Sequence, residues 1–372
     1  MRNLWKLYAY LAIYRALNAW IVRTQFDPDE SWQTLEPAYC AVFSRSDVLP
    51  LSSLARQRDK KGMGRGYYDQ DCALTWEWTR SDLDVTDGDE QRTEFSWYLR
   101  HPIIRSALLG PIRSYMAVLP TIVFYRCIRF IYKTTNWLNS AVMTTLVRKG
   151  PAVVHAVLFA ASTDLAVYFI AYKAFCNRQG SDDSKAFYSL LASISSWFNG
   201  YALVRTYANS IECSLCAVAT AMLCSELFRP TLESKERESF IMKKEWKKNI
   251  GGSGNDTRIA SFAAFFIGGI CVAIRFSTVA FWIPLGLFTC QCKAFDENNS
   301  RLVTFLWFKY IILYCSYALF GLIVSCYIDN IFYLGNGYNG IVIPFLANYY
   351  FNVIEGMNLV IKVKVFILYV FS

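Results

Sequence analysis

Long apolar runs alternate with polar segments along most of the chain. The first run extends from Leu4 to Val22, and the others cover about residues 104–131, 151–175, 186–204, 211–228, 259–290, 302–327 and 341–371. Most are close to the roughly 20 residues that an α-helix needs to cross a bilayer, and the run at 259–290 fits one long span or two short ones. They lack the strict alternation of a membrane β-barrel. Because backbone groups in lipid must be satisfied internally, the pattern predicts an all-α polytopic membrane bundle.

The composition supports a membrane protein and excludes a water-soluble one. Of the 372 residues, 54% are hydrophobic and 17% are aromatic, which is too apolar for a soluble chain of this size. The net charge of +9 does not indicate nucleic-acid binding, because Lys and Arg gather at the ends of apolar runs as topology signals do. No small-residue cleavage site follows the first run, which contains Lys6 and Arg15, so we expect a retained first span rather than a signal peptide.

The pattern divides the chain into three parts. We expect a first transmembrane span at residues 1–22, a lumenal catalytic loop at 23–103 and a multi-span bundle at 104–372. Arg2 and Lys6 hold the N-terminus in the cytosol by the positive-inside rule, so the loop after the first span faces the lumen. Cys40 and Cys72 could form a disulfide there, although the sequence alone favours unpaired cysteines.

Later basic residues give conflicting orientations. Arg129, Lys133, Arg148 and Lys149 place the region before the third run in the cytosol. Counting spans then puts residues 230–258 in the lumen, and we favour this count although four lysines there favour the cytosol (Lys243, Lys244, Lys247 and Lys248). Glycosylation sequons at Asn255 and Asn298 would be used only on the lumenal side.

Acidic side chains gather directly after the first span. Residues 26–33 read FDPDESWQ and are called the acidic motif here. Asp27, Asp29 and Glu30 are costly in lipid, so they must lie where the span meets water. Pro28 biases Asp27 away from helix, while carboxylates at the next positions are favourable in the first turn of a helix that begins there. A capping cluster that only ends the span is the alternative.

Other polar residues interrupt apolar or aromatic surroundings. Glu77 lies between Trp76 and Trp78, a combination that suits either a membrane-interface anchor or stacking against a sugar ring. Arg205, Arg275 and Asp164 lie within or between apolar runs, where a charge costs roughly 3 kcal/mol and usually faces a cavity or a partner. These three residues indicate either structural pairing, for instance of Asp164 with one of the two arginines, or substrate binding.

The acidic motif with Glu36, residues 74–78 (LTWEW) and residues 205–212 (RTYANSIE) resemble the glycosyltransferases of family 22 in sequence, order and spacing. The resemblance extends over about residues 20–356, with weaker matches at 104–106, 112–115, 282–285, 329–333 and 345–356. It implies a GT-C-like fold in the endoplasmic reticulum membrane, with the acidic first lumenal loop as the active site. It further implies dolichyl-phosphate mannose as donor and a glycosylphosphatidylinositol (GPI) glycolipid as acceptor, which receives its third mannose through an α1,2 linkage.

The chain departs from the family at two places. Phe276 replaces the proline that follows the arginine matching Arg275. Relatives continue past the end of this chain and a His- and Trp-rich lumenal motif is absent after Gly356, so we expect a truncated or divergent C-terminus. The alternatives are therefore an enzyme for the fourth GPI mannose or an N-glycan precursor, and an inactive homologue. The competing classes are a secondary transporter and a non-catalytic membrane subunit. A transporter is disfavoured, because no internal repeat is evident and the densest acidic cluster lies at the end of a span.

The residue chemistry suits transfer from a lipid-linked sugar phosphate, whose phosphate leaves readily and needs no general acid. Inversion then requires one base for the acceptor hydroxyl, for which we predict Asp29, with Glu30 orienting the acceptor and Asp27 as second choice. Arginine suits the phosphate. The predicted substrate-binding residues are Trp32, Gln33, Trp76, Glu77, Trp78, Arg105, Arg205, Asn209 and Arg275. Because the chain has only two histidines and no Cys/His cluster, we expect neither a metal nor a cofactor.

Overall fold

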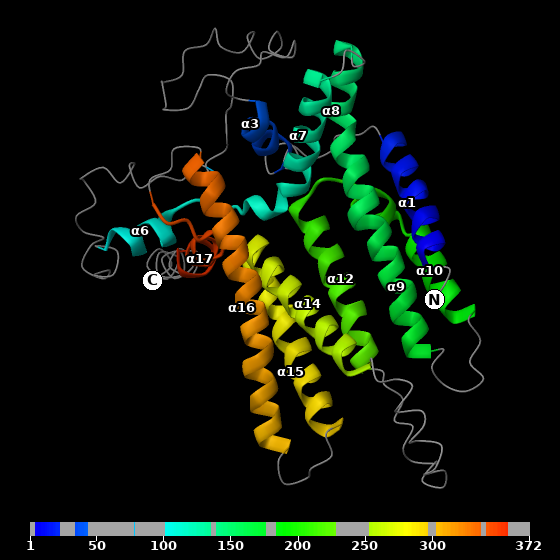
Figure 1. Ribbon diagram of the computed structural model, residues 1–372, viewed down its shortest axis with the longest axis vertical. Coiled ribbons are helices and arrows are strands. Elements are labelled where there is room, and N and C mark those ends of the chain that lie inside the picture. Colours follow the sequence, from blue (N-terminus) through cyan, green and yellow to red (C-terminus); the bar gives the residue numbers. More distant parts are fainter. Residues whose placement is uncertain are drawn as a thin grey trace, which may run out of the picture.

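The computed structural model describes residues 4–22, 34–43, 78, 101–134, 139–175, 184–227, 253–296, 303–335 and 340–355. Every regular element among these residues is helical (Figure 1), as the sequence predicts. The predicted loop at 23–103 is described only at 34–43, Trp78 and 101–103, so its catalytic character stays a prediction.

The described helices follow this order along the chain. The N-terminal half contains α1 (Leu4–Ile21), α3 (Glu36–Phe43), α6 (Pro102–Leu109), the 3₁₀ turn η5 (Tyr115–Ala117), α7 (Leu119–Thr134), α8 (Ser140–His155), the π-helical turn η6 (Ala156–Ala160), α9 (Ala161–Phe175), α10 (Ser184–Ser195) and α11 (Trp197–Tyr201). The C-terminal half contains α12 (Ala208–Leu227), α14 (Ser253–Ile274), η7 (Phe276–Thr278), α15 (Val279–Asp296), α16 (Val303–Gly335), α17 (Pro344–Tyr349) and the π-helical η8 (Tyr350–Glu355).

Several helices in the described parts of the chain suit a membrane. Three are long and apolar enough to cross it, namely Ala141–Phe175, Phe276–Phe295 and Thr304–Leu334, and Ala208–Cys224 and Arg258–Ile274 are shorter apolar helices. These helices support a multi-pass membrane protein. α1 is not among the three long ones, because Lys6, Arg15 and Asn18 lower its hydropathy, so its role as the first span stays a prediction.

The apolar run at 104–131 is not one span, which corrects the prediction. α6 ends before Gly110 and Pro111, and α7 begins only at Leu119. Pro111 lacks a backbone N–H and disfavours helical geometry at Gly110, so the helix cannot continue. α6 lies at the side of the bundle, next to α17 and crosswise to α16, while α7 rises away from the bundle (Figure 1). The run at 259–290 forms two helices, since Arg275 between α14 and η7 is extended with φ −153° and ψ 115°.

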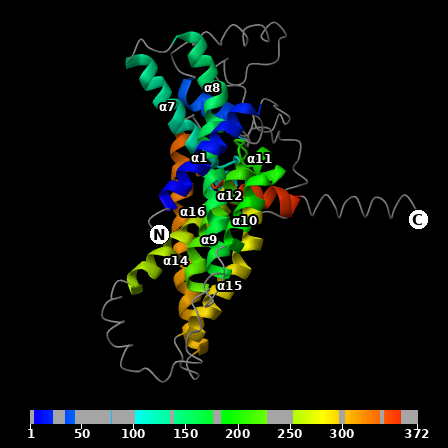
Figure 2. The same ribbon diagram turned by 90° about the vertical axis from the view of Figure 1, so that its right-hand side faces the viewer.

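Two ends of the bundle can be distinguished. At one end, here called the motif end, α1 finishes just before the acidic motif, α12 begins and α16 finishes (Figure 1). Thr34, which directly follows the motif, contacts Thr206 at this end. α7 and α8 project beyond the other helices here, as both views show (Figures 1 and 2). α9, α12 and α15 finish at the opposite end (Figure 1).

This arrangement reverses two predictions of orientation. Lys149 donates to the carbonyl of Trp20 at 3.4 Å and lies 4.6 Å from that ring, so α8 meets the finishing turn of α1 at the motif end. Arg129 donates to the Val42 carbonyl of α3. Lys149 and Arg129 therefore lie at the motif end, because their partners, Trp20 and Val42, flank the acidic motif in the chain. α12 finishes at Leu227 and α14 begins at Ser253, both at the end of the bundle opposite the motif, although the count of spans put residues 230–258 on the side of the motif. The count was wrong because residues 104–131 do not cross the bundle, and one crossing fewer moves each later connection to the other end.

α14 and α16 pack with their backbones in contact. A Cβ added at Gly269 would lie 1.9 Å from the Ala318 carbonyl oxygen, and one at Gly321 would lie 2.1 Å from the Phe266 carbonyl oxygen. Small residues of this kind allow close helix approach in membranes. The Phe265 ring stacks on Tyr314 with centroids 4.3 Å apart. On the other side of the bundle, α12 meets α9 through a 2.8 Å hydrogen bond from the Thr163 hydroxyl to Ser214.

Candidate active site at the motif end

Arg205 lies in the turn between α11 and α12. Its backbone N–H donates to the Ala202 carbonyl at 3.2 Å, and the Ser210 hydroxyl donates to the same carbonyl at 2.8 Å. The guanidinium carbon is 4.3 Å from the centroid of the Tyr201 ring, and only 4% of Arg205 is exposed. A desolvated cation over an aromatic face is favourable. The turn therefore holds Arg205 against the protein interior.

The described residues on both sides of the acidic motif contact this same turn. Before the motif, the Asn18 amide donates to the Gly200 carbonyl at 2.7 Å. After it, the Thr34 hydroxyl donates to Thr206 Oγ1 at 3.2 Å, and both threonines are fully buried. The chain is thus fastened to residues 200–206 before and after the motif.

The remaining predicted residues of the acidic stretch lie outside the described part of the chain. These are Asp27, Asp29, Glu30, Trp32 and Gln33, together with Trp76 and Glu77 of the second motif. Their predicted roles as base, orienting group and substrate contacts stay predictions. Arg105 belongs to α6, and its predicted contact with substrate also stays a prediction.

Arg275 is held at the break between α14 and η7. Its Nη1 donates to Asn209 Oδ1 at 3.0 Å and lies 3.9 Å from Glu212 Oε2. Asn209 and Glu212 are one turn apart on α12, so they face Arg275 together. The Arg275 side chain is 48% exposed. The neighbouring Phe276 packs on Tyr349 with centroids 4.8 Å apart.

The two predicted arginines therefore differ in access. Arg275 presents half of its side chain to the surroundings while Asn209 and Glu212 fix its orientation. Arg205 is buried on Tyr201. The exposed part of the Arg275 side chain is open to contact, whereas Arg205 exposes almost none of its surface. Asn209 accepts a hydrogen bond from Arg275, and its predicted contact with substrate stays a prediction.

Trp78 lies in the core. It is 2% exposed and packs edge-on against Tyr115 at 4.9 Å between centroids, with Tyr333 at 6.4 Å. Large buried aromatic side chains of this kind contribute strongly to packing. The burial gives Trp78 a packing role, and its predicted contact with a sugar stays a prediction.

Asp329 is a buried carboxylate to which sequence reasoning assigned no role. It is 0% exposed and accepts hydrogen bonds from the Ser114 hydroxyl, at 3.0 and 2.9 Å, and from the Tyr115 N–H at 2.6 Å. The Tyr333 hydroxyl donates to the Arg113 carbonyl at 2.7 Å. Two weak sequence matches, 112–115 and 329–333, thus meet in space. A single Asp within the long apolar α16 was the available signal.

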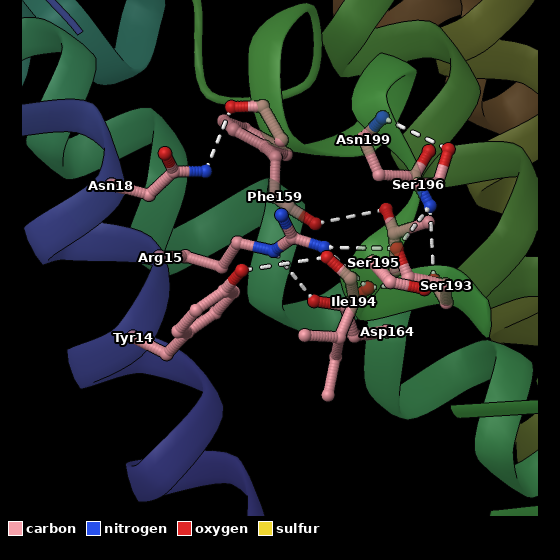
Figure 3. Close-up of polar contacts among 12 residues, drawn as sticks. Tyr14, Arg15, Asn18, Phe159, Asp164, Ser193, Ile194, Ser195, Ser196 and Asn199 are labelled. Carbon is pink, nitrogen blue, oxygen red and sulfur yellow. Dashed lines mark hydrogen bonds and ion pairs between the residues drawn. The ribbon is translucent and has the colours of Figure 1, made fainter. Parts of the chain in front are cut away.

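Asp164 forms a structural ion pair, which was one of the two alternatives, but its partner is Arg15 rather than Arg205 or Arg275. The Arg15 Nε to Asp164 Oδ2 distance is 2.7 Å and the Nη2 to Oδ1 distance is 2.9 Å, and both side chains are 0% exposed (Figure 3). The other arginines have their own contacts at the ends of α11 and α14. The spacing of Leu11, Arg15 and Ala19, all buried on one face of α1, was the signal that could have found this pair.

With this geometry in place, comparison with known proteins decides the family. The model of the Alg9-like mannosyltransferase family matches residues 109–360. The chain belongs to this family. The resemblance to glycosyltransferase family 22 is confirmed, and the matched range includes Arg205, Asn209, Arg275 and Asp329.

Curated members of the family support the same assignment at low identity. "GPI mannosyltransferase 3" of Yarrowia lipolytica is 28% identical over 277 residues, which is 74% of this chain and 35% of the relative. "GPI mannosyltransferase 3" of Candida albicans is 24% identical over 76% of this chain and 37% of its own length. "GPI alpha-1,2-mannosyltransferase 3" of Mus musculus is 26% identical over 56% of this chain and 26% of its own length.

These matches set two limits. The chain spans about a third of the length of the curated relatives that it matches. No solved structure matches the chain significantly.

Two chemical predictions for this family member can be compared with the described residues. No group of His, Cys, Asp and Glu side chains within the described ranges could hold a metal ion, and metal independence stays a prediction. Cys40 is disulfide-bonded. The prediction of an unpaired Cys40 is therefore wrong, because pairing depends on spatial approach that spacing along the chain does not reveal.

Proposed function

We propose that the protein is an α1,2-mannosyltransferase that adds the third mannose to the GPI precursor from dolichyl-phosphate mannose at the endoplasmic reticulum membrane. Family membership supports mannosyl transfer, and the names of three relatives support the GPI acceptor. The main structural support is a pair of hydrogen bonds that hold the chain on both sides of the acidic motif against the turn that contains Arg205. Asn18 bonds to Gly200 before the motif, and Thr34 bonds to Thr206 after it.

The donor phosphate would be bound by Arg275. The Arg275 side chain is partly exposed and is held in one orientation by Asn209 and Glu212. Both partners lie near the start of α12, at the motif end. Planar guanidinium groups match phosphate oxygens. Arg205, which is buried on Tyr201, would support the same anion through its charge rather than by direct contact.

The transfer step follows from these groups. Asp29 takes the proton from the acceptor hydroxyl as the hydroxyl oxygen attacks the anomeric carbon of mannose from the face opposite the phosphate. A new glycosidic C–O bond forms and the bond from carbon to the phosphate oxygen breaks, with inversion. Dolichyl phosphate leaves as an anion beside Arg275. Glu30 orients the acceptor, Asp27 is the second choice of base, and no metal takes part.

The alternative functions differ from the proposed one in the acceptor or in activity. Enzymes of the same family could act on the fourth GPI mannose or on an N-glycan precursor, and an inactive homologue would bind lipid without transfer. The names of the relatives favour the third GPI mannose.

Complementation tests this proposal. Cells that lack the third GPI mannosyltransferase accumulate a precursor with two mannoses, and expression of the full chain should convert it to the three-mannose form. The matched control is Asp29→Asn, which should reach the same membrane level without conversion. Persistence of the two-mannose precursor despite a normal level of the parent chain would contradict the GPI assignment.

A further inference from the structure

A buried polar network joins α1 to α9, α10 and α11 beside the candidate site (Figure 3). Asp164 accepts from Arg15 Nε and Nη2 and also from the Ser193 hydroxyl at 2.7 Å. Arg15 Nη2 donates in addition to the Ser193 carbonyl at 3.2 Å. The carboxylate therefore has three donors, which compensates for its burial.

The network continues into α11, which leads to Arg205. The Asn199 amide donates to the Ser193 carbonyl at 3.1 Å and to its hydroxyl at 3.0 Å. One residue later, the Gly200 carbonyl accepts from Asn18 at 2.7 Å. Both α1 side chains face this glycine, since a Cβ built at Gly200 would lie 3.4 Å from Asn18 Nδ2 and 3.8 Å from Arg15 Nη1.

We propose that Asn18 and the Arg15–Asp164 pair are positioning residues, which fix the segment Gly200–Thr206, and with it Arg205, relative to the chain that enters the acidic motif. The inference rests on the proposed function for its effect on turnover. Before the motif in the chain, the network holds the segment through the hydrogen bond from Asn18 to Gly200. After the motif, Thr34 holds it through the hydrogen bond to Thr206.

Helix packing alone does not require this network. A buried ion pair is costly to desolvate, and apolar residues of similar volume often pack two helices equally well. Leu11 and Ala19 of α1 already belong to two buried apolar clusters, which include Ala161 and Ala156 respectively. The hydrogen bond from Asn18 instead ends on the carbonyl of Gly200, in the last turn of α11. The next residue is Tyr201, whose ring packs against the Arg205 guanidinium.

The test compares Asn18→Ala with Tyr14→Phe in the full chain. Tyr14 also lies on α1 and donates to a backbone carbonyl at 3.5 Å from an exposed position, but its acceptor is Ile194 of α10, outside segment 200–206. Asn18→Ala should speed amide hydrogen exchange at residues 200–206 about fivefold, the change expected for loss of one hydrogen bond. It should also lower kcat about fivefold or more with a smaller change in donor KM, at an unchanged protein level. Tyr14→Phe should change neither.

A second variant covers the case in which Asn18→Ala fails to accumulate. The double variant Arg15→Met with Asp164→Leu removes both buried charges, so it should accumulate and still show faster exchange at residues 200–206. If the parent chain transfers no mannose, the proposed function fails and the exchange measurement alone decides this inference. If the parent chain is active and Asn18→Ala matches Tyr14→Phe in exchange and in kcat, the positioning role is wrong.

Discussion

Two regions of the bundle are held together by different interactions. Where α1 meets α9 and α10, the contact is a buried ion pair with further hydrogen bonds, centred on Arg15 and Asp164. Where α14 meets α16, it is backbone against backbone at Gly269 and Gly321, with aromatic rings around it. Hydrogen bonds fix direction as well as distance, whereas close packing of small residues chiefly contributes stability.

The difference indicates what each region does. The polar region adjoins the turn that carries Arg205 and both contacts beside the acidic motif, so its geometry affects the candidate site directly. The glycine contact lies along the apolar lengths of α14 and α16, so it supports the helix that ends at Arg275 without touching the site. Replacements in the first region should therefore affect stability and turnover, and those in the second should affect stability first.

The largest effect is expected for Asp164→Ala. It leaves Arg15 charged, buried and without its carboxylate, which typically costs about 3–5 kcal/mol. The measurement is thermal unfolding of the purified protein in detergent, with the double variant Arg15→Met and Asp164→Leu recovering most of the loss. A single variant as stable as the parent would mean that water reaches Arg15 or that the pair contributes little.

A smaller loss is expected in the second region. In Gly269→Ala the new methyl group would meet the Ala318 carbonyl oxygen, so α14 and α16 must separate at a cost of about 3 kcal/mol. Gly286→Ala is the matched control, because its Cβ would lie 3.5 Å from Phe265 Cε1 in ordinary contact. Equal melting temperatures of the two variants would show that the helices are not packed as closely as described.

The smallest stability change concerns the contact between α16 and the motif end. Ser114→Ala removes one donor from Asp329 but leaves the Tyr115 N–H, so we expect a loss of about 2 kcal/mol. Ser316→Ala removes an exposed hydroxyl that bonds within α16 and should change the melting temperature little. If the two variants melt together, Asp329 does not depend on Ser114.

The sequence predicted much of this architecture, and the parts that it missed have physical causes. The helices and the family were readable from the apolar runs and from motifs such as residues 205–212, whereas the run at 259–290 was left open between one span and two. The partner of Asp164 was not, because it lies 149 positions away in the chain and pairing depends on how α1 rotates against α9. The sides of the later connections were wrong because one broken helix at Pro111 changes every one that follows.

The candidate site was predictable in part. Arg205 and Arg275 were predicted because their charges lie within or between apolar runs, and Asn209 belongs to the motif at residues 205–212. The sequence could not separate a buried guanidinium on Tyr201 from an exposed one held by Asn209 and Glu212. Burial depends on neighbours that are distant in sequence.

The central claim is that the acidic motif carries the base for mannosyl transfer. Its most direct test is the initial rate of transfer from labelled dolichyl-phosphate mannose to GPI precursor in membranes that contain equal amounts of the parent chain, Asp29→Asn or Asp27→Asn. Asparagine keeps the shape of the side chain but cannot take the proton, so Asp29→Asn should lower the rate about a hundredfold or more. Asp27→Asn should lower it less. Parent-level transfer by Asp29→Asn would contradict the choice of base, and parent-level transfer by both would contradict the catalytic role of the motif.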